Sequence, residues 1–190
     1  MIRASVVVVG ASLGGLAAVE TVLRRLPARF PVPVALVQHR RADSDSRLVE
    51  LLQAHSALKI LEPEDKDPLL PGHFYVAPPN YHMMIDKDSI ALSVDPPVSH
   101  ARPSIDVLFE SAAATHGAST VGVILTAASE DGARGAAAIK RAGGHLLVQD
   151  PNTAESPVAA RATLARTPVD GVLRLERLAD ELVALCRRGL

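Results

Sequence analysis

The sequence predicts an α/β fold with a doubly wound, mostly parallel sheet, helices on both faces and an antiparallel excursion at one edge. Short apolar segments alternate with helical patterns along most of the chain. These segments are continuously apolar rather than alternating, which is typical of strands covered on both faces. The chain has 190 residues and no internal repeat or linker-like segment. We therefore expect one domain, residues 1–190.

The expected elements alternate in the order that a parallel sheet requires. They are strand 6–9, helix 14–26, strand 34–37, helix 44–55, helix 103–116, strand 122–125, helix 133–142, strand 146–148, helix 154–165 and helix 178–187. Helix 103–116 is expected because Pro103 suits a first helical turn and the segment SIDVLFESAAATH keeps one apolar face. Ser104 is expected to cap this helix.

The segment HFYVAPPNYHMMIDKDSIALS, residues 73–93, interrupts this alternation. It contains three short apolar runs, separated by the sequences PPN and DKDS. Both separators are rich in residues that favour turns. This segment is the predicted antiparallel excursion.

Composition and charge exclude several classes of protein. The 20 Lys and Arg residues nearly balance the 21 Asp and Glu residues, which argues against nucleic acid as the main partner. The only cysteine, Cys186, cannot form an internal disulfide and is expected to be inert, so a cytoplasmic location is the simpler interpretation. No apolar run approaches the roughly 20 residues of a membrane helix, so no membrane insertion is expected. The histidines lack metal-ligand spacing, and neither a metal nor a cofactor is expected.

The stretch VVVVGASLGGLAAVE, residues 6–20, carries the most specific motif. It places Ser12 in the pattern G-x-S-x-G between a strand and a helix, the arrangement of a nucleophile elbow. The backbone N–H of Leu13 is the candidate oxyanion donor at this helix start. A dinucleotide site would need glycine at position 12 and an acid where the second strand ends in Gln38-His39. A third alternative is that Ser12 merely caps the first helix.

A serine nucleophile needs a base, and the base needs an acid to orient it. Of the seven histidines, only His39 directly follows a clear parallel-strand run, VPVALVQH. Asp131 stands just beyond the strand VGVILT, and Asp150 after the strand HLLVQ is the rival acid. A structural role for His39 and a helix-capping role for Asp131 are the alternatives.

Several segments together resemble the catalytic domain of the chemotaxis protein-glutamate methylesterases. They are VVVVGASLGG, ALVQHR, LLPGHFYVAPPNYHM, PPVSHARPSIDVLFESAA, VGVILTAASEDGARG and AGGHLLVQDP. The resemblance implies a parallel α/β sheet with a Ser-His-Asp triad at Ser12, His39 and Asp131, and so prefers Asp131 to Asp150. It implies hydrolysis of glutamyl methyl esters in chemoreceptor-type proteins, with glutamine deamidation as a second activity. A methylated chemoreceptor-like protein is then the substrate.

Many family members also carry a regulatory receiver domain at the N-terminus. This chain reaches its first expected strand at residue 6, so the resemblance is to a stand-alone form without that domain.

The sequence departs from the family pattern at three places. Leu13 replaces a threonine or small residue, residues 127–130 (AASE) replace a glycine-rich stretch, and residues 158–160 (VAA) replace Gly-Met-Pro. Because alanine cannot adopt a positive φ cheaply, Ala127→Gly is expected to raise activity if the loop needs such an angle. The altered loop supports an alternative function, a catalytically weak binding module in a signalling complex.

Three arginines near the expected site have two interpretations each. Arg40 and Arg41, directly after His39, either make the mouth of the site basic or form a solvated pair. Arg102 either reaches the cleft or has a structural role. His73, His82 and His100 are expected to be structural or to lie at the rim of the site.

Overall fold

The computed structural model describes residues 4–41 and 47–187. Seven strands form one parallel sheet in the order β3-β4-β2-β1-β7-β8-β9. Its strands are β1 Val6–Ala11, β2 Val34–Gln38, β3 Lys59–Leu61, β4 His73–Val76, β7 Thr120–Ile124, β8 His145–Gln149 and β9 Gly171–Leu173. The predicted doubly wound, mostly parallel α/β fold is confirmed.

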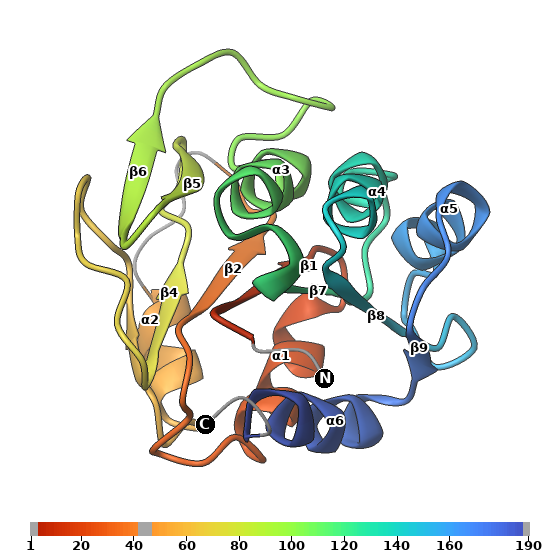
Figure 1. The fold of residues 1–190 in the computed structure, drawn as a ribbon, viewed down its shortest axis with the longest axis horizontal. Helices are drawn as coiled ribbons and strands as arrows, with labels where there is room; N and C mark the ends of the chain where they lie inside the picture. The colour runs from red at the N-terminus through yellow and green to blue at the C-terminus, as the bar shows by residue number, and fades with distance from the viewer. Residues whose placement is uncertain (1–3, 42–46, 188–190) are drawn as a thin grey trace.

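Helices cover both faces of the sheet (Figure 1). On one face lie α1 Gly15–Leu23, α2 Arg47–Gln53 and α6 Leu175–Arg187; on the other lie α3 Ile105–His116, α4 Ala133–Arg141 and α5 Val158–Arg166. Because successive side chains of a strand point to opposite faces, β1 contributes to both cores. Val7 and Val9 pack with the first set of helices, while Val6 and Val8 pack with the second. This two-sided burial explains the continuously apolar strands.

The antiparallel part is a hairpin of β5 His82–Asp86 and β6 Ser89–Ser93. It forms its own two-stranded sheet and packs against α3, where the Ser111 hydroxyl accepts the N–H of Ile85. The first of the three apolar runs differs from the other two. It forms β4, which pairs in parallel with β2 and β3.

Several predicted boundaries differ from the observed ones. Helix α5 begins at Val158 rather than at residue 154, because Pro157 occupies the position before it and the preceding residues form a turn. Helix α6 begins at Leu175, before the predicted residue 178. The expected helix 44–55 corresponds to α2, and its first part, 44–46, lies outside the described residues. The three-residue strands β3 and β9 were not predicted.

The order of the strands determines where a ligand is expected to bind. From β1 the chain continues on one side to β2 and, later, on the other side to β7. In open α/β sheets, ligands bind beyond the carboxyl ends of the strands at such a switch point. The segments that follow β1, β2 and β7 are therefore the place to look for a site.

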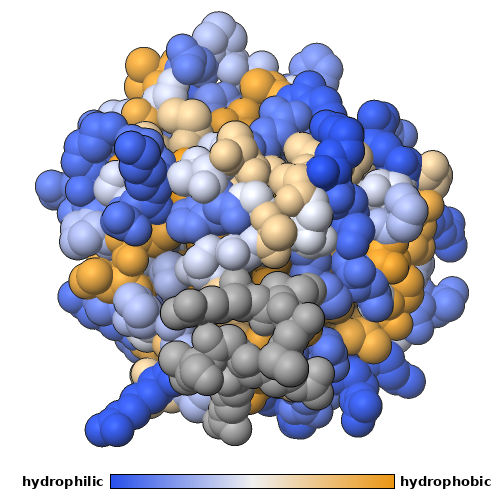
Figure 2. All heavy atoms as spheres, in the orientation of Figure 1, coloured by the Kyte–Doolittle hydropathy of each residue, from blue (hydrophilic) through white to orange (hydrophobic). Residues whose placement is uncertain are grey.

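The surface carries both polar and apolar groups. Figure 2 shows one face of the molecule, on which hydrophobic residues lie in separate groups among hydrophilic ones. Within residues 4–41 and 47–187, every helix is too short or too polar to cross a membrane.

Candidate active site

The main chain brings Ser12 and His39 side by side. Each is the first residue after its strand, β1 or β2, and the two strands pair in parallel with Ala11 opposite Gln38. The N–H of His39 donates to the carbonyl of Ala11 at 3.0 Å, and the N–H of Ser12 donates to the carbonyl of Thr126 at 3.0 Å. Ser12 thus lies between the segments that follow β2 and β7, at the switch point of the sheet.

His39 is joined to Asp131, 92 positions later in the chain. Its Nε2 lies 2.8 Å from Oδ2 of Asp131, and the Asp131 side chain is fully buried. Since Nε2 faces the carboxylate, Nδ1 is the ring nitrogen left to act as a base. Asp150, the rival acid, instead accepts hydrogen bonds from the backbone and side-chain amides of Asn152. The structure therefore pairs His39 with Asp131.

A serine nucleophile and its base are joined by a hydrogen bond when they react. Among the described residues, no hydrogen bond joins the Ser12 hydroxyl to the His39 ring. Both residues nevertheless lie at the same edge of the sheet, on adjacent strands. Catalytic hydrogen bonds are often long or misaligned in unliganded enzymes, and a serine hydroxyl reorients by rotation about one bond.

The Asp131 carboxylate accepts four hydrogen bonds. The donors are Nε2 of His39, the hydroxyl of Ser104 at 2.8 Å, and the N–H groups of Ile105 and Asp106 at 2.7 and 3.1 Å. Burial acts to raise the pKa of Asp131, but the hydrogen bonds from His39, the two N–H groups and Ser104 outweigh it, so the pKa lies below its ordinary value. This carboxylate stays ionised next to the histidine.

These bonds correct two capping predictions. Ser104 precedes α3 but makes no side-chain cap, because its hydroxyl donates to Asp131. Asp131 itself caps α3 rather than the helix that follows it in sequence. His82 lies behind Ser104: its Nδ1 accepts the N–H of Ser104 at 3.3 Å and its Nε2 donates to the carbonyl of Pro96. The predicted structural role of His82 agrees with these contacts.

The turn after β1 is tight and depends on glycine at position 14. Gly14 has φ +75°, and a Cβ there would lie 2.6 Å from the Cβ of Glu155, so other residues are strained at this position. The residue that caps α1 is Gly14, without a side-chain hydrogen bond, which contradicts the alternative that Ser12 caps this helix. Small residues thus leave Ser12 at the tip of a tight turn.

Two side chains that sequence reasoning missed hold this turn from both sides. The amide of Gln38 donates to the carbonyl of Ser12 at 2.8 Å, and the hydroxyl of Thr126 donates to the carbonyl of Leu13 at 2.9 Å. In a trans peptide the carbonyl and the following N–H point in opposite directions. The Leu13 N–H therefore points away from Gln38, and within the described part of the chain no acceptor is bonded to it.

The loop at residues 127–130 fits the structure without glycine. All four residues are described, and none has a positive φ. Ala127 is fully buried; its N–H donates to the carbonyl of Ser156, and its carbonyl accepts the N–H of Ala159. The departure from the glycine-rich family pattern therefore causes no backbone strain at these positions.

Three shallow hollows surround this arrangement. One, of about 330 Å³, is lined by His39, Arg40, His100 and Arg102 among others. A second, of about 530 Å³, includes Ser12, Leu13, Gln38 and Glu155, and a third, of about 450 Å³, includes Ser129, Asp131 and Arg134. Each of Ser12, His39 and Asp131 therefore lines one of these hollows.

Two of the three arginines near the site, Arg40 and Arg102, are held by other groups of the chain. The Arg40 side chain is only 7% exposed, forms an ion pair with Glu62 and donates to the carbonyl of Ala77 at 3.1 Å. This excludes the solvated-pair interpretation for Arg40. Arg102 reaches the same hollow, as one of its two interpretations required, and is anchored by hydrogen bonds to Oδ1 of Asn80 and to the carbonyl of Val94.

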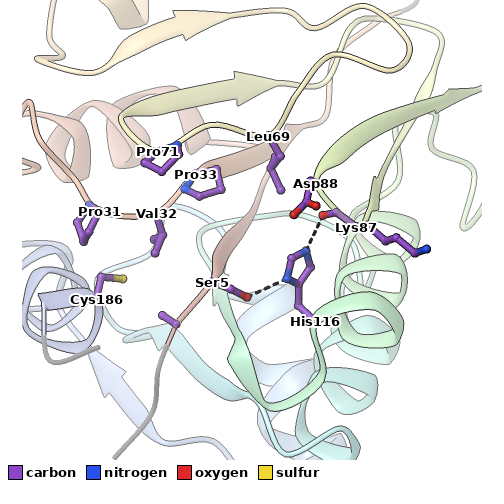
Figure 3. A pocket seen from close by; sticks show the side chains of 11 residues that line it. Ser5, Pro31, Val32, Pro33, Leu69, Pro71, Lys87, Asp88, His116 and Cys186 are labelled. Atoms are coloured by element: carbon purple, nitrogen blue, oxygen red, sulfur yellow. Dashed lines mark hydrogen bonds between the residues drawn. The ribbon is translucent and has the colours of Figure 1, made fainter. Parts of the chain in front are cut away.

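A second serine–histidine pair lies in a different hollow, of about 300 Å³, formed by segments that precede β1, β2 and β4 (Figure 3). The Ser5 hydroxyl is 2.8 Å from Nδ1 of His116, whose Nε2 donates to the backbone carbonyl of Lys87 at 3.0 Å. A carbonyl thus takes the place of an orienting carboxylate, at the sheet edge opposite to the switch-point site. Cys186 also lines this hollow, and burial raises the pKa of its thiol to about 12, as expected of an inert cysteine.

Comparisons with known proteins decide the family. The family model for the CheB methylesterase matches residues 7–182. The chain belongs to the CheB methylesterase family. A Leptospira interrogans protein, named provisionally as a protein-glutamate methylesterase/protein-glutamine glutaminase, is 43% identical over 97% of this chain and 96% of its own length. An Anaeromyxobacter dehalogenans protein-glutamate methylesterase/protein-glutamine glutaminase is 41% identical over 97% of this chain and 54% of its own length.

The solved structures agree with this assignment. The crystal structure of the Thermotoga maritima CheB methylesterase catalytic domain matches with a TM-score of 0.93 and 28% sequence identity. The match covers 97% of this chain and 100% of that domain. The family resemblance predicted from the sequence motifs is confirmed, and a dinucleotide-dependent oxidoreductase finds no support.

Proposed function

We propose that this chain hydrolyses methyl esters of glutamyl side chains in chemoreceptor-type proteins, with Ser12 as nucleophile, His39 as base and Asp131 as orienting acid. Deamidation of glutamine at such sites is the second proposed activity, since relatives carry both names. The observation that carries the proposal is the buried His39–Asp131 pair directly beside the elbow serine. A cytoplasmic place of action follows from this substrate.

In the first half of the reaction, Oγ of Ser12 attacks the ester carbonyl carbon while Nδ1 of His39 takes its proton. The negative charge that develops on the carbonyl oxygen is stabilised by the free N–H of Leu13. When the tetrahedral intermediate collapses, the bond to the methoxy oxygen breaks, and Nδ1 returns the proton to give methanol. An acyl-enzyme on Ser12 remains.

In the second half, water attacks the acyl-enzyme while Nδ1 of His39 takes a proton from it. The bond to Oγ of Ser12 then breaks and that proton returns to the serine, releasing a glutamate side chain. Asp131 holds Nε2 throughout and stabilises the imidazolium. Its four hydrogen bonds keep it ionised and fixed in place. For a glutamine substrate the same steps release ammonia.

The test is methanol release from a methylated receptor fragment. Ser12→Ala and His39→Ala are each expected to lower turnover by roughly 10⁴- to 10⁶-fold, with the double variant hardly worse, because triad members act as a unit. Asp131→Asn is expected to lower turnover less than either. Ser5→Ala is the matched control, since it removes the serine of the other serine–histidine pair. Normal turnover by Ser12→Ala, or a loss in Ser5→Ala alone, would contradict the proposal.

A further inference from the structure

Gln38 links the two residues proposed to react. It is the last residue of β2, and its Nε2 donates to the carbonyl of Ser12 at 2.8 Å and to the carbonyl of His39 at 3.2 Å. Both partners are acceptors, so the nitrogen of the amide must face them. One side chain thus ties together the peptide groups that follow the proposed nucleophile and the proposed base.

The space around the Gln38 amide is shaped for this contact. A Cβ on Gly15 would lie 2.1 Å from Oε1 of Gln38, so only glycine lets the amide approach the start of α1 so closely. Oε1 is buried and, among the described residues, has no hydrogen-bond partner. Burying an unpaired carbonyl oxygen is unfavourable. The unpaired Oε1 therefore makes this placement of the Gln38 side chain unfavourable, although Nε2 bonds the two carbonyls.

We propose that Gln38 is a positioning residue for catalysis, an inference that rests on the proposed function of Ser12 and His39. Together with the N–H of Gly15, which donates to the same oxygen at 2.8 Å, the amide fixes the Ser12 carbonyl and so turns the Leu13 N–H in the opposite direction, toward the proposed position of the oxyanion. By holding the His39 carbonyl, it restrains the main chain that carries the imidazole. Both effects are needed because a reacting geometry tolerates little error: a misplacement of about 1 Å can cost roughly 10²-fold in rate.

General stability alone does not require this contact. The adjoining strands are already joined by parallel pairing from Val7 to Ala11, and the His39 N–H donates to the Ala11 carbonyl. The chain offers a comparison in Gln53, whose Nε2 also donates to two backbone carbonyls, those of Ser56 and Leu58 at 3.3 and 3.0 Å, and whose Oε1 in addition accepts the N–H of Ile60 at 2.9 Å. Gln53 lies at the end of α2, outside the three hollows around the proposed site.

The experiment compares Gln38→Met with Gln53→Met in the full chain. Both substitutions remove the amide and roughly keep the length of the side chain. Gln38→Met is expected to lower kcat for methanol release by roughly 10- to 100-fold with KM within about twofold, whereas Gln53→Met leaves kcat unchanged. Inactivation by a fluorophosphonate, which reads the reactivity of the serine without receptor binding, is expected to slow in parallel. Thermal unfolding of both variants reports any general loss of stability.

A second measurement separates positioning from structure. If Gln38 positions the reacting groups and does not hold the substrate, then Gln38→Met has no effect on substrate binding in the Ser12→Ala background, where binding is measured without turnover. Gln38→Glu keeps the volume but, when ionised, donates no hydrogen bond, and it replaces Gln38→Met should that variant fail to fold.

Two outcomes overturn the inference: a kcat of Gln38→Met equal to that of Gln53→Met, or weaker substrate binding caused by Gln38→Met in the Ser12→Ala background. Failure of the proposed function looks different, because it appears as normal turnover in Ser12→Ala itself.

Discussion

Asp131 and Asp106 each cap the helix that begins beside the other. Asp131, which precedes α4, accepts the N–H groups of Ile105 and Asp106 at the start of α3. Asp106, in the first turn of α3, accepts the N–H groups of Gly132 and Gly135 at the start of α4, at 3.0 and 2.7 Å. Carboxylates are favoured at helix N-termini, where N–H groups lack intrahelical partners. The loop that carries the proposed acid Asp131 is therefore fixed by two sets of hydrogen bonds, those that Asp131 accepts from α3 and those that Asp106 accepts from α4.

The first prediction concerns Asp106, which is almost fully buried. Asp106→Ala leaves two N–H groups without acceptors and is expected to lower the free energy of unfolding by about 1–3 kcal/mol, and to lower turnover because the Asp131 loop loosens. Asp106→Asn keeps the single oxygen that accepts both bonds and is expected to cost less than about 1 kcal/mol, since the lost ion pair with half-exposed Arg134 is weak. Urea unfolding and methanol release measure both variants. Equal effects of the two substitutions would show that the cap is not the reason for the burial of Asp106.

The second prediction concerns the pH dependence of stability. The pKa of folded Asp131 lies below its ordinary value of 3.8, so the ionised carboxylate stabilises the fold at higher pH, and this stabilisation is lost as the pH falls through the lowered pKa. The difference in unfolding free energy between the wild type and Asp131→Asn is expected to shrink as the pH falls from about 5 to below about 4.

The measurement is urea unfolding across this pH range in an Asp106→Asn background. That background removes a second titration, because burial, together with the charge of Asp131, raises the pKa of Asp106. A difference that grows as the pH falls from about 5 to below about 4 would contradict the assigned direction for Asp131.

The sequence predicted the parts of the site that depend on local pattern. Ser12 and His39 end continuously apolar strands, and in a parallel sheet such ends share an edge, so their proximity followed from the strand pattern. The hydrogen-bond partners of Asp131 could not be predicted from the strand pattern. Its bonds to Ser104 and Ile105 join residues 27 and 26 positions apart, and they depend on how α3 docks beside the loop after β7. Strands β3 and β9 have only three residues each, too few to show a period.

The third prediction reverses an expectation from sequence. Since residues 127–130 adopt ordinary φ values, Ala127→Gly is not expected to raise turnover. It removes a fully buried methyl group and adds backbone freedom, so the free energy of unfolding is expected to fall by about 1–2 kcal/mol. Methanol release within about twofold of wild type, together with a lower urea midpoint, is the expected result. A tenfold gain in turnover would show that the alanine loop misplaces an oxyanion donor.

The last prediction isolates the Leu13 N–H. Leu13 is 53% exposed, so Leu13→Ala is expected to leave stability and turnover nearly unchanged. Replacing the Ser12–Leu13 amide with an ester by semisynthesis removes the N–H and keeps the Ser12 carbonyl as a weaker acceptor for the Gln38 amide and the Gly15 N–H. One oxyanion donor contributes roughly 10²- to 10³-fold, and because the charge develops only in the transition state, the loss is expected in kcat rather than in KM.

An ester at the Leu13–Gly14 bond, where the Leu13 carbonyl is held by Thr126, is the matched control and is expected to lower kcat less. If both esters lower kcat equally, the effect comes from a weakened turn, and the donor must be sought elsewhere, first among the N–H groups of residues 128–131.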